Sequence, residues 1–398
     1  MRIGIDYTAA VRQQGGIGRY TRSLIRALSE IDTRNQYVLF VMGGHEADDG
    51  HGNWPDNFRL RPVPISDRWF NVLWQRVRVP VPVQVWTGRL DLFHSPDFVL
   101  PPLGRTPAVL TVHDLSFLRV PWCFVPGFRD YLEAAVSRSV RKASLILADS
   151  LSTERDLAEL LGVELERVHV LYPGVDSRFR PVTDPEALGE VRQRYSLPES
   201  FVLGLSTLQP RKNFAGLIDA FGRLLAAEGG AQAIQGLQLV IAGGSGWLSE
   251  DIQEAIGRAG LEGRVRVVGF VDDHDLPALY TLASAFAFPS WYEGFGVPVL
   301  EAMACGTPVV AADNSSLPEV VGEAGLLVGA GDADALAQAL FSLLVRQDVR
   351  QRLVARGLER VRRFSWPASA TALLQAYERT LGGYPGGGQR TRSQSRSV

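Results

Sequence analysis

Short apolar runs alternate with longer amphipathic segments along almost the whole chain. The runs are continuously apolar, which is typical of parallel strands that are buried on both faces. Strands that alternate with helices predict right-handed βαβ units and doubly wound sheets, so we predict an α/β fold. The expected strands are residues 2–6, 37–42, 91–94, 108–113, 145–148 and 168–172, then 201–205, 237–242, 265–268, 285–289, 308–312 and 325–328. The expected helices include residues 18–30, 128–142, 153–161, 214–227, 276–283 and 333–345.

The length of 398 residues predicts two domains, at about 150 residues per domain. We place them at residues 1–175 and 198–363, because a polar, proline-bearing stretch separates the two sets of strands. Residues 364–381 form a late helix that could cap either domain. Residues 382–398 are rich in Gly, Ser, Gln and Arg, which predicts a disordered tail. Ligands of open parallel sheets bind beyond the carboxyl ends of the strands, so two such domains predict a deep interdomain cleft with one substrate held by each.

The composition excludes several classes of protein. A net charge of −2 gives no overall attraction to nucleic acid, and 46% hydrophobic residues exclude disorder over most of the length. The two cysteines, Cys123 and Cys305, argue against a disulfide scaffold. The first residues begin directly as a strand, without the basic head and apolar core of a signal peptide, and no stretch approaches about 20 apolar residues. We therefore expect a cytoplasmic protein without a transmembrane helix.

A glycine-rich loop with two glutamates follows the expected strand 285–289. Gly294 and Gly296 let the backbone approach a ligand, and the amides at the start of the next helix favour an anion such as phosphate. Glu293 stands before that helix and Glu301 in its first turn, where the helix dipole stabilises both carboxylates. Two carboxylates beside a phosphate site suit the hydroxyls of a sugar and a ribose. A plain first-turn charge is the alternative for either glutamate alone, but the glycine turn favours a ligand site.

A basic pair, Arg211 and Lys212, follows the expected strand 201–205 in a loop that also contains Thr207. The guanidinium offers a fork for two phosphate oxygens, and the ammonium adds a compact charge. A solvated helix start is the alternative, but cations at a helix N-terminus oppose the helix dipole and need an anionic partner. Lys212 and Lys142 are the only lysines among 41 basic residues, which makes this position informative.

Two features at helix starts concern capping and metals. Ser316 and Glu319 have the spacing of a capping box, in which the serine caps the helix and the glutamate reaches back. Asp332 and Asp334 have Asp-x-Asp spacing, but they precede a helical segment, so an acidic cap is preferred over a metal site. The chain also lacks a Cys/His cluster for zinc. We therefore expect catalysis without a metal and without a cofactor.

The first half contributes a glycine loop and polar strand ends. Gly15 and Gly16 belong to a G-G-x-G sequence, whose spacing differs from the dinucleotide fingerprint G-x-G-x-x-G. We expect this loop to reach across to donor phosphates. His113 and Asp114 end the strand 108–113 and are expected to line a cleft, with a hydrogen-bonded structural histidine as the alternative. His94 is similarly placed and is expected to shape an acceptor pocket.

Together these motifs resemble the retaining glycosyltransferases of family 4, which have the GT-B fold. The resemblance extends from Arg2 to about Phe364. One motif departs slightly, since Pro173 stands where the family commonly reads Asn-Gly-Val-Asp. The matching motifs are Gly15-Gly16-Ile17-Gly18-Arg19-Tyr20, Thr111-Val112-His113-Asp114, Tyr172-Pro173-Gly174-Val175-Asp176, Pro210-Arg211-Lys212-Asn213 and Glu293-Gly294-Phe295-Gly296 with its Glu-x7-Glu spacing.

The resemblance implies a role for each motif. Arg211 and Lys212 would hold the donor diphosphate, Glu293 would contact the transferred sugar and Glu301 would bind the nucleotide ribose. Residues 364–381 would cross back onto the first domain. The further residues implied at the donor are Gly15, Gly16, Thr207, the nucleobase shelf Phe270 and Val271 (ordinary core packing being the alternative), Gly294, and the loop amides of Phe295, Gly296 and Val297. Those expected at the acceptor are Arg19, His94, His113 and Asp114. His113 is also expected close to the reacting sugar, as a catalytic residue beside Glu293, Arg211 and Lys212.

The implied reaction is the transfer of a hexosyl unit from a nucleotide diphosphate sugar to a hydroxyl of a glycan or lipid-linked sugar. The context of residues 111–117 looks most like mannosyltransferases of surface polysaccharide assembly, which favours GDP-mannose over UDP-glucose. A hydrolase, synthase or epimerase on the same architecture, a non-catalytic nucleotide-sugar sensor and an NAD-dependent oxidoreductase are the alternatives. Basic residues along the helix 128–142 suggest weak contact with an anionic membrane, with a solvated face as the alternative.

Overall fold

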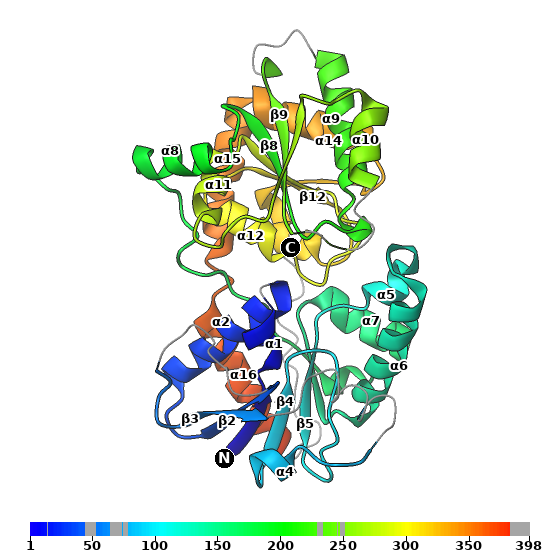
Figure 1. Cartoon of the computed structure of the whole chain (residues 1–398), viewed down its shortest axis with the longest axis vertical. Helices are drawn as coiled ribbons and strands as arrows, with labels where there is room; N and C mark the ends of the chain where they lie inside the picture. Colours follow the sequence, from blue (N-terminus) through cyan, green and yellow to red (C-terminus); the bar gives the residue numbers. More distant parts are fainter. Residues whose placement is uncertain are drawn as a thin grey trace, which may run out of the picture. The chain divides into compact units, whose positions relative to one another are not determined.

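The computed structural model describes residues 1–13, 15–43, 53–63, 74, 79–228, 234–244, 246 and 251–382. The chain divides into two compact units, which Figure 1 shows with their elements labelled. The first unit comprises Met1–Leu115, Gly127–Gly174 and the chain from Trp366 onward, and the second comprises Ser116–Pro126 and Val175–Ser365. Of the predicted tail, residues 383–398 lie outside the described residues.

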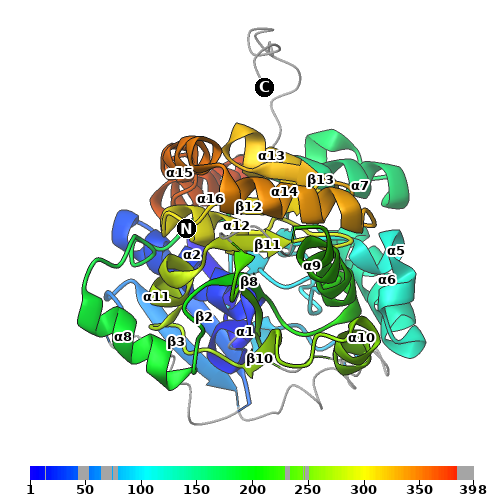
Figure 2. The same ribbon diagram turned by 90° about the horizontal axis from the view of Figure 1, so that it is seen from above.

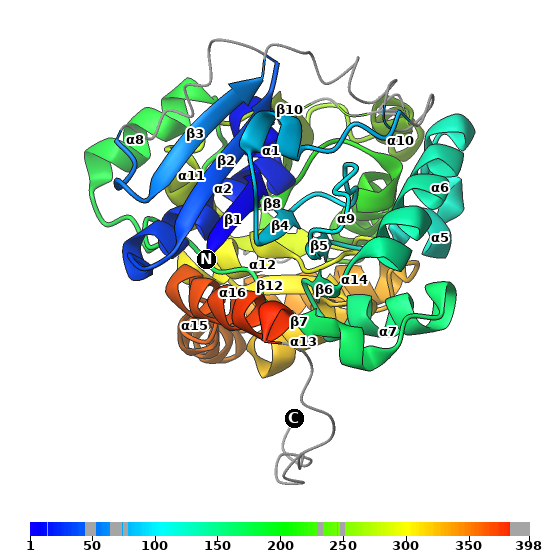
Figure 3. The same ribbon diagram turned by 90° about the horizontal axis from the view of Figure 1, so that it is seen from below.

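A parallel sheet of seven described strands forms the centre of the first unit, in the order β3-β2-β1-β4-β5-β6-β7 (Figure 3). The strands are β1 (Arg2–Asp6), β2 (Gln36–Met42), β3 (Phe58–Val63), β4 (Leu92–Ser95), β5 (Ala108–Val112), β6 (Leu145–Ala148) and β7 (Val168–Val170). The α-helices are α1 (Thr8–Arg12), α2 (Gly16–Ile31), α4 (Gln84–Thr87), α6 (Pro126–Lys142), α7 (Leu151–Leu161) and α16 (Trp366–Leu381).

Strand β3 is absent from the sequence prediction. It pairs only with β2 at the edge of the described sheet, and both of its arginines, Arg59 and Arg61, are exposed. It also contains Pro62, which lacks a backbone N–H and is therefore tolerated at a sheet edge. Because β3 has a neighbouring strand on one edge only, several of its residues are exposed and polar. A mixed polar sequence of this kind lacks the continuous apolar run by which the other strands were predicted.

Helix α16 completes the first unit from the far end of the sequence. It packs along α2, as Figure 1 shows in red beside blue. Leu373 and Tyr377 of α16 are buried in the same apolar cluster as Ile3, Leu24 and Leu92. The family resemblance implies that this helix returns to the first domain, and these contacts place it there.

The second unit has a parallel sheet of six described strands in the order β10-β9-β8-β11-β12-β13. Helices α9, α10 and α14 cover one face, and α8, α11, α12 and α15 lie on the other (Figures 1 and 2). The strands are β8 (Phe201–Leu205), β9 (Gln238–Ala242), β10 (Val265–Gly269), β11 (Ala285–Phe288), β12 (Val309–Ala312) and β13 (Leu326–Val328). The α-helices are α5 (Ser116–Arg119), α8 (Pro185–Arg194), α9 (Phe214–Glu228), α10 (Asp251–Ala259), α11 (Leu276–Leu282), α12 (Val297–Ala304), α13 (Leu317–Val321), α14 (Ala333–Val345) and α15 (Gln347–Val361).

The start of the second unit differs from the expected residue 198. Asp184 caps α8, and Pro185 occupies its first turn, where a missing N–H is harmless. The helix packs on α11, and Arg194 at its end binds Asp275 at 2.7 Å. Polar residues and prolines that predict a linker therefore belong to a capped surface helix of the second unit.

Within the described residues, no helix is both long and apolar enough to span a membrane.

Candidate active site

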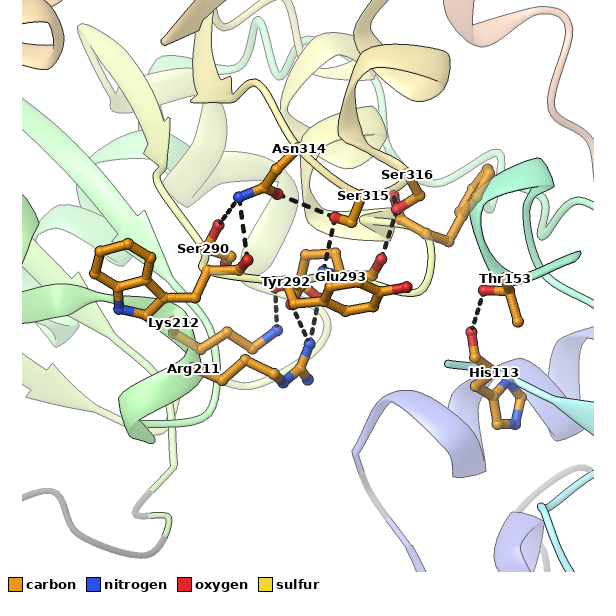
Figure 4. A network of polar contacts seen from close by, with 12 residues as sticks. His113, Thr153, Arg211, Lys212, Ser290, Tyr292, Glu293, Asn314, Ser315 and Ser316 are labelled. Atoms are coloured by element: carbon orange, nitrogen blue, oxygen red, sulfur yellow. Dashed lines mark hydrogen bonds and ion pairs between the residues drawn. The ribbon is translucent and has the colours of Figure 1, made fainter. Parts of the chain in front are cut away.

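The carboxyl ends of β8 and β11, two adjacent strands, bring together a buried cluster of charges (Figure 4). The Nζ atom of Lys212 lies 2.7 Å from Oε1 of Glu293. The Nη1 atom of Arg211 donates to Oε2 of Glu293 at 3.0 Å and to the carbonyl oxygen of Tyr292 at 2.6 Å. The structure therefore joins the predicted basic pair and the first predicted glutamate in one cluster.

This cluster has an excess of positive charge. Lys212 and Glu293 are only 8% and 5% exposed, so water screens the charges little. Burial alone would raise the pKa of Glu293, but the charges of Arg211 and Lys212, with the hydrogen bond from Lys212, hold that pKa below its usual value. Two cations and one carboxylate leave one positive charge, which favours the binding of an anion at this edge of the sheet.

Asn213, which sequence reasoning did not select, holds the basic loop in place. It adopts a left-handed conformation with φ of 56° directly after Lys212. Its side-chain amide donates to the carbonyl oxygens of Pro289 at 3.1 Å and Ala330 at 2.7 Å. The basic loop is thereby tied to the ends of two further strands, so the cations have a defined backbone beneath them.

The segment after β12 supports the glutamate loop. The Ser315 hydroxyl accepts a hydrogen bond from the backbone N–H of Glu293 at 3.0 Å. The amide of Asn314 donates to the carbonyl oxygens of Ser290 and Trp291, both at 3.1 Å (Figure 4). These residues lie more than 20 positions from the loop, and no local pattern predicts their contacts with it.

Ser316 corrects the predicted capping box. It occupies the N-cap position of α13, but its side chain makes no capping hydrogen bond. Its hydroxyl donates instead toward the carbonyl oxygens of Glu293 at 3.0 Å and Phe295 at 2.9 Å. Ser316 therefore supports the buried loop of the charged cluster instead of capping α13.

The glycine turn opens α12 as predicted. Gly296 is the N-cap residue with φ of 106°, and a Cβ atom there would lie 2.7 Å from Cδ2 of Leu317. Both facts require glycine. Gly294 and Phe295 are buried beside it, and Val297 begins the helix. The predicted phosphate-binding amides of residues 295–297 therefore lie at the start of this helix.

Glu301 is one turn further along α12 than predicted, since the first turn of the helix contains no acidic residue. The Tyr280 hydroxyl donates to Oε2 of Glu301 at 3.0 Å, and the glutamate is 1% exposed. A hydrogen-bonded carboxylate is compatible with burial at this position. The assignment of Glu301 to the nucleotide ribose stays a prediction.

Three loops meet at the same edge of the second sheet. The backbone N–H of Leu208 donates to the carbonyl oxygen of Gly244 at 3.0 Å, which joins the loops after β8 and β9. Phe270 follows β10 and is 54% exposed, whereas its neighbour Val271 is buried. Thr207 is also exposed. An exposed aromatic ring is available for stacking, as the predicted nucleobase shelf requires.

His113 lies at the carboxyl end of β5 in the first unit. Its Nδ1 atom lies 2.7 Å from Oδ2 of Asp149, and its Nε2 atom lies 2.9 Å from the carbonyl oxygen of Pro96. Burial would lower the pKa of His113, but Asp149, Asp97 and the Pro96 carbonyl together raise that pKa to about 9. Asp149 was not identified from the sequence, because it follows a different strand.

His94 lies in the core of the first unit, away from the surface at which an acceptor pocket was expected. It is completely buried, with Nδ1 at 2.8 Å from the Tyr377 hydroxyl and Nε2 at 2.9 Å from the Thr111 hydroxyl. Burial, and to a smaller extent the charge of His113, lowers the pKa of His94 to about 3. His94 is therefore a neutral core residue that binds α16 to the first sheet.

The remaining predicted residues of the first unit lie at its surface or near it. Gly15 and Gly16 are exposed at the start of α2, and a Cβ atom at either would meet nothing within 4 Å. The N-terminus of a helix favours anions, as the predicted phosphate contact requires. Arg19 and Asp114 are half-buried. Their assignment to an acceptor stays a prediction.

Asp332 and a cluster around Asp275 are the two places where acidic side chains of the described residues could be taken for metal ligands. The Asp332 side chain accepts a hydrogen bond from the backbone N–H of Ala335 at 2.9 Å, which confirms the predicted acidic cap. Among the described residues, Asp272, His274 and Asp275 bring possible ligand atoms within 4.8 Å of one another. The guanidinium of Arg194 already binds both carboxylate oxygens of Asp275, at 2.9 and 2.7 Å. The buried carboxylate of Asp275 is therefore already paired with a cation from α8.

Comparison with known proteins agrees with this architecture. Residues 14–179 match the sequence model described as Glycosyltransferase Family 4, and residues 191–360 match Glycosyl transferases group 1. O-antigen chain mannosyltransferase B of Escherichia coli is 36% identical over 380 residues, which cover 91% of this chain and 96% of that protein.

Solved structures share the fold. Sucrose-phosphate synthase from Thermosynechococcus elongatus superposes with a TM-score of 0.74 at 23% identity, over 96% of this chain and 99% of that one. Anabaena HepE in complex with UDP-glucose has a TM-score of 0.72 at 21% identity, over 95% and 99%. The two Rossmann-like domains have the GT-B fold of these neighbours. The chain belongs to glycosyltransferase family 4.

Proposed function

We propose that this glycosyltransferase moves a mannosyl unit from GDP-mannose to a hydroxyl of a glycan or lipid-linked sugar, with retention at the anomeric carbon. The observation that carries the proposal is the buried Arg211–Lys212–Glu293 cluster, whose surplus positive charge suits a diphosphate. The mannosyl donor is supported by the 36% identical Escherichia coli relative, which is described as a mannosyltransferase. HepE was solved with UDP-glucose, so that donor is the second candidate.

In the proposed mechanism the bond between the anomeric carbon and the departing diphosphate oxygen breaks while the acceptor oxygen bonds to the same face of that carbon. The acceptor proton passes to the departing phosphate oxygen. Arg211 and Lys212 would stabilise the charge that develops on the diphosphate, together with the first amides of α12. Glu293 would accept hydrogen bonds from the transferred sugar. Because these groups supply the positive charge, the proposal requires no metal ion.

A panel of nucleotide sugars tests the proposal through the release of free nucleoside diphosphate, with and without a glycan acceptor. We expect acceptor-dependent release, greatest with GDP-mannose, and the same rate in the presence of a chelator. Release without any acceptor would identify a hydrolase instead. Activity that is lost with the chelator and restored by magnesium would contradict the metal-free mechanism.

Lys212→Ala probes the central cation. We expect kcat to fall by about 10²–10³, as for the loss of a preorganised group that stabilises transition-state charge. Lys142→Ala is the matched control, since Lys142 is the only other lysine and lies exposed at the end of α6. Near-normal turnover of Lys212→Ala, with the control also normal, would contradict the assigned role.

A further inference from the structure

We propose that Asp149 is a positioning residue that holds His113 as a doubly protonated imidazolium, so that His113 supplies a fixed positive charge and does not accept the acceptor's proton. This inference rests on the proposed function, because it assigns the part that His113 plays in the transfer reaction. It concerns the charge state of one side chain, which is measurable without any substrate.

The hydrogen bonds of His113 leave neither ring nitrogen available as a base. The carbonyl oxygen of Pro96 can only accept, so Nε2 must carry a proton and donate it. The other nitrogen, Nδ1, lies 2.7 Å from the Asp149 carboxylate, a length typical of a charge-assisted hydrogen bond. A general base needs a free lone pair directed at the substrate hydroxyl. Neither Nδ1 nor Nε2 of His113 offers one, because each donates a proton to an acceptor of the protein.

Residues 149–153, at the start of α7, bind both the side chain and the backbone of His113. Asp149 binds the ring, and the next residue, Ser150, caps α7 by accepting from the N–H of Thr153 at 3.0 Å. The Thr153 hydroxyl donates to the His113 carbonyl oxygen at 3.1 Å, as Figure 4 shows. The start of α7 therefore fixes the backbone of His113 and also carries the carboxylate that binds its ring.

The charges around His113 favour the imidazolium. Asp149 faces the ring from the end of β6 and Asp97 from the segment after β4, and both raise the pKa of His113. Asp114 follows in the chain, His94 lies on β4, and Tyr20 of α2 packs edge-on against the ring with centroids 4.8 Å apart.

His94 provides an internal comparison. Both side chains are buried, His94 completely and His113 to 9% exposed. The ring of His94 binds only hydroxyl groups, and its pKa is about 3, whereas that of His113 is about 9. The difference lies in the partners, since carboxylates compensate for the loss of water around a charged ring. The Oδ1 atom of Asp149 is buried and has no hydrogen-bond partner among the described residues. Burial raises the pKa of Asp149, and the charge and hydrogen bond of the His113 ring oppose that shift. The His113 ring is therefore the counter-charge of the buried Asp149 carboxylate.

NMR of the full chain labelled with ¹⁵N-histidine tests the inference directly. The chain has six histidines, and His113→Gln identifies the signals of His113 by their loss. We expect both ring nitrogens to remain protonated to at least pH 8, with a titration midpoint near the pKa of about 9. In Asp149→Asn we expect the midpoint to fall by two pH units or more, a hundredfold weaker binding of the proton. A neutral ring at pH 7 in the wild-type protein would overturn the proposal.

Matched variants separate the positioning role from general damage. Asp130→Asn changes an exposed carboxylate of α6 and should leave the midpoint unchanged. Asp97→Asn removes a charge without the direct hydrogen bond and should lower the midpoint by less than Asp149→Asn does. An Asp149→Asn protein that folds and keeps the wild-type midpoint would overturn the proposal. If that variant does not fold, the wild-type titration and Asp97→Asn still decide the outcome.

The pH profile of turnover gives the kinetic readout. We expect kcat of the wild-type enzyme to fall as the pH rises through about 9, and kcat of Asp149→Asn to fall at a lower pH with partial recovery at pH 6. Turnover that instead rises as His113 loses its proton would identify a base and overturn the inference. If His113 is an imidazolium but no nucleotide sugar is turned over, the proposed function fails while the charge assignment stands.

Discussion

The Ser316 hydroxyl shares its proton between the carbonyl oxygens of Glu293 and Phe295, at 3.0 and 2.9 Å. Ser316→Ala would leave both buried carbonyl groups without this donor. We expect a loss of about 1–3 kcal/mol in the free energy of unfolding and a higher KM for the donor, because the loop around Glu293 loosens. Denaturant unfolding and donor titration measure the two effects. Ser342→Ala, at a half-buried position of α14, is the control, and an unchanged KM in Ser316→Ala would contradict the supporting role.

The functional role of some residues can be predicted from their neighbours in sequence, and that of others cannot. The residue types around Arg211, Lys212 and Glu293 indicate an anion site, because cations at a helix start and a glycine turn before a helix are unusual in ordinary surface loops. Asn314 and Asp149 carry no such local signal. Each acts on a loop that follows a different strand, so only the folded sheet reveals the contact.

The two glycine turns at helix starts differ in what they require of the backbone. An alanine at Gly296 would be forced to φ of 106° and into contact with Leu317, so we expect Gly296→Ala to lose at least about 1–2 kcal/mol of stability. An alanine at Gly15 fits, since φ there is −74° and the surroundings are open. We expect Gly15→Ala to keep the wild-type unfolding midpoint and to lower turnover, if this loop approaches the phosphates. Denaturant unfolding and kcat/KM separate the two, and equal stability losses would contradict this distinction.

At the level of elements, strongly apolar segments agree with the prediction and weakly apolar ones do not. The strands predicted at 108–113 and 201–205 match β5 and β8 closely. The edge strand β3 and the surface helix α8 were missed, because each has only one side against a neighbour and carries polar residues on the other. The hydrophobic periodicity of a segment depends on how much of its surface is buried. A strand or helix that is buried on one side only is therefore harder to predict from the sequence.

At the scale of the whole molecule, α16 makes the first unit depend on the far end of the sequence. A chain that ends at Ser365 would lose Leu373 and Tyr377 from the core and leave Nδ1 of His94 without the Tyr377 hydroxyl. Each large apolar side chain contributes about 1.5–3 kcal/mol when buried, so several together approach the total stability of a domain. We expect the truncated protein to lack a cooperative unfolding transition for its first unit. A chain that ends at Gly382 keeps α16 and should unfold like the full chain, and cooperative unfolding of both would contradict this role.

The two buried histidines give the first unit opposite responses to pH. The pKa of His94 is about 3 in the folded state, so the unfolded state gains a proton as the pH falls below about 6.5. The free energy of unfolding therefore falls as the pH falls, by up to about 1.4 kcal/mol per pH unit, or about 2 kcal/mol between pH 6.5 and 5. The stabilisation from His113 is present below about pH 6.5 and is lost as the pH rises through about 9.

His94→Gln tests this pH dependence, because glutamine can still bond to hydroxyl groups but does not titrate. We expect the variant to be less stable than the wild type at pH 7 but to lose less stability between pH 6.5 and 5. Denaturant unfolding at a series of pH values measures both slopes. Identical slopes on the acid side would show that His94 is not responsible.

The local sequence pattern predicted the α/β class, the order of most strands and helices, and the basic pair and glutamate that form the charged cluster. It did so because continuous apolar runs, capping residues and glycine turns act on neighbours within a few positions. Only the folded chain shows that His94 is a core residue, that Ser316 supports a loop, and that Asp149 binds His113. Those outcomes depend on which strand ends lie side by side, and in parallel sheets adjacent strands are separated in sequence by whole helices.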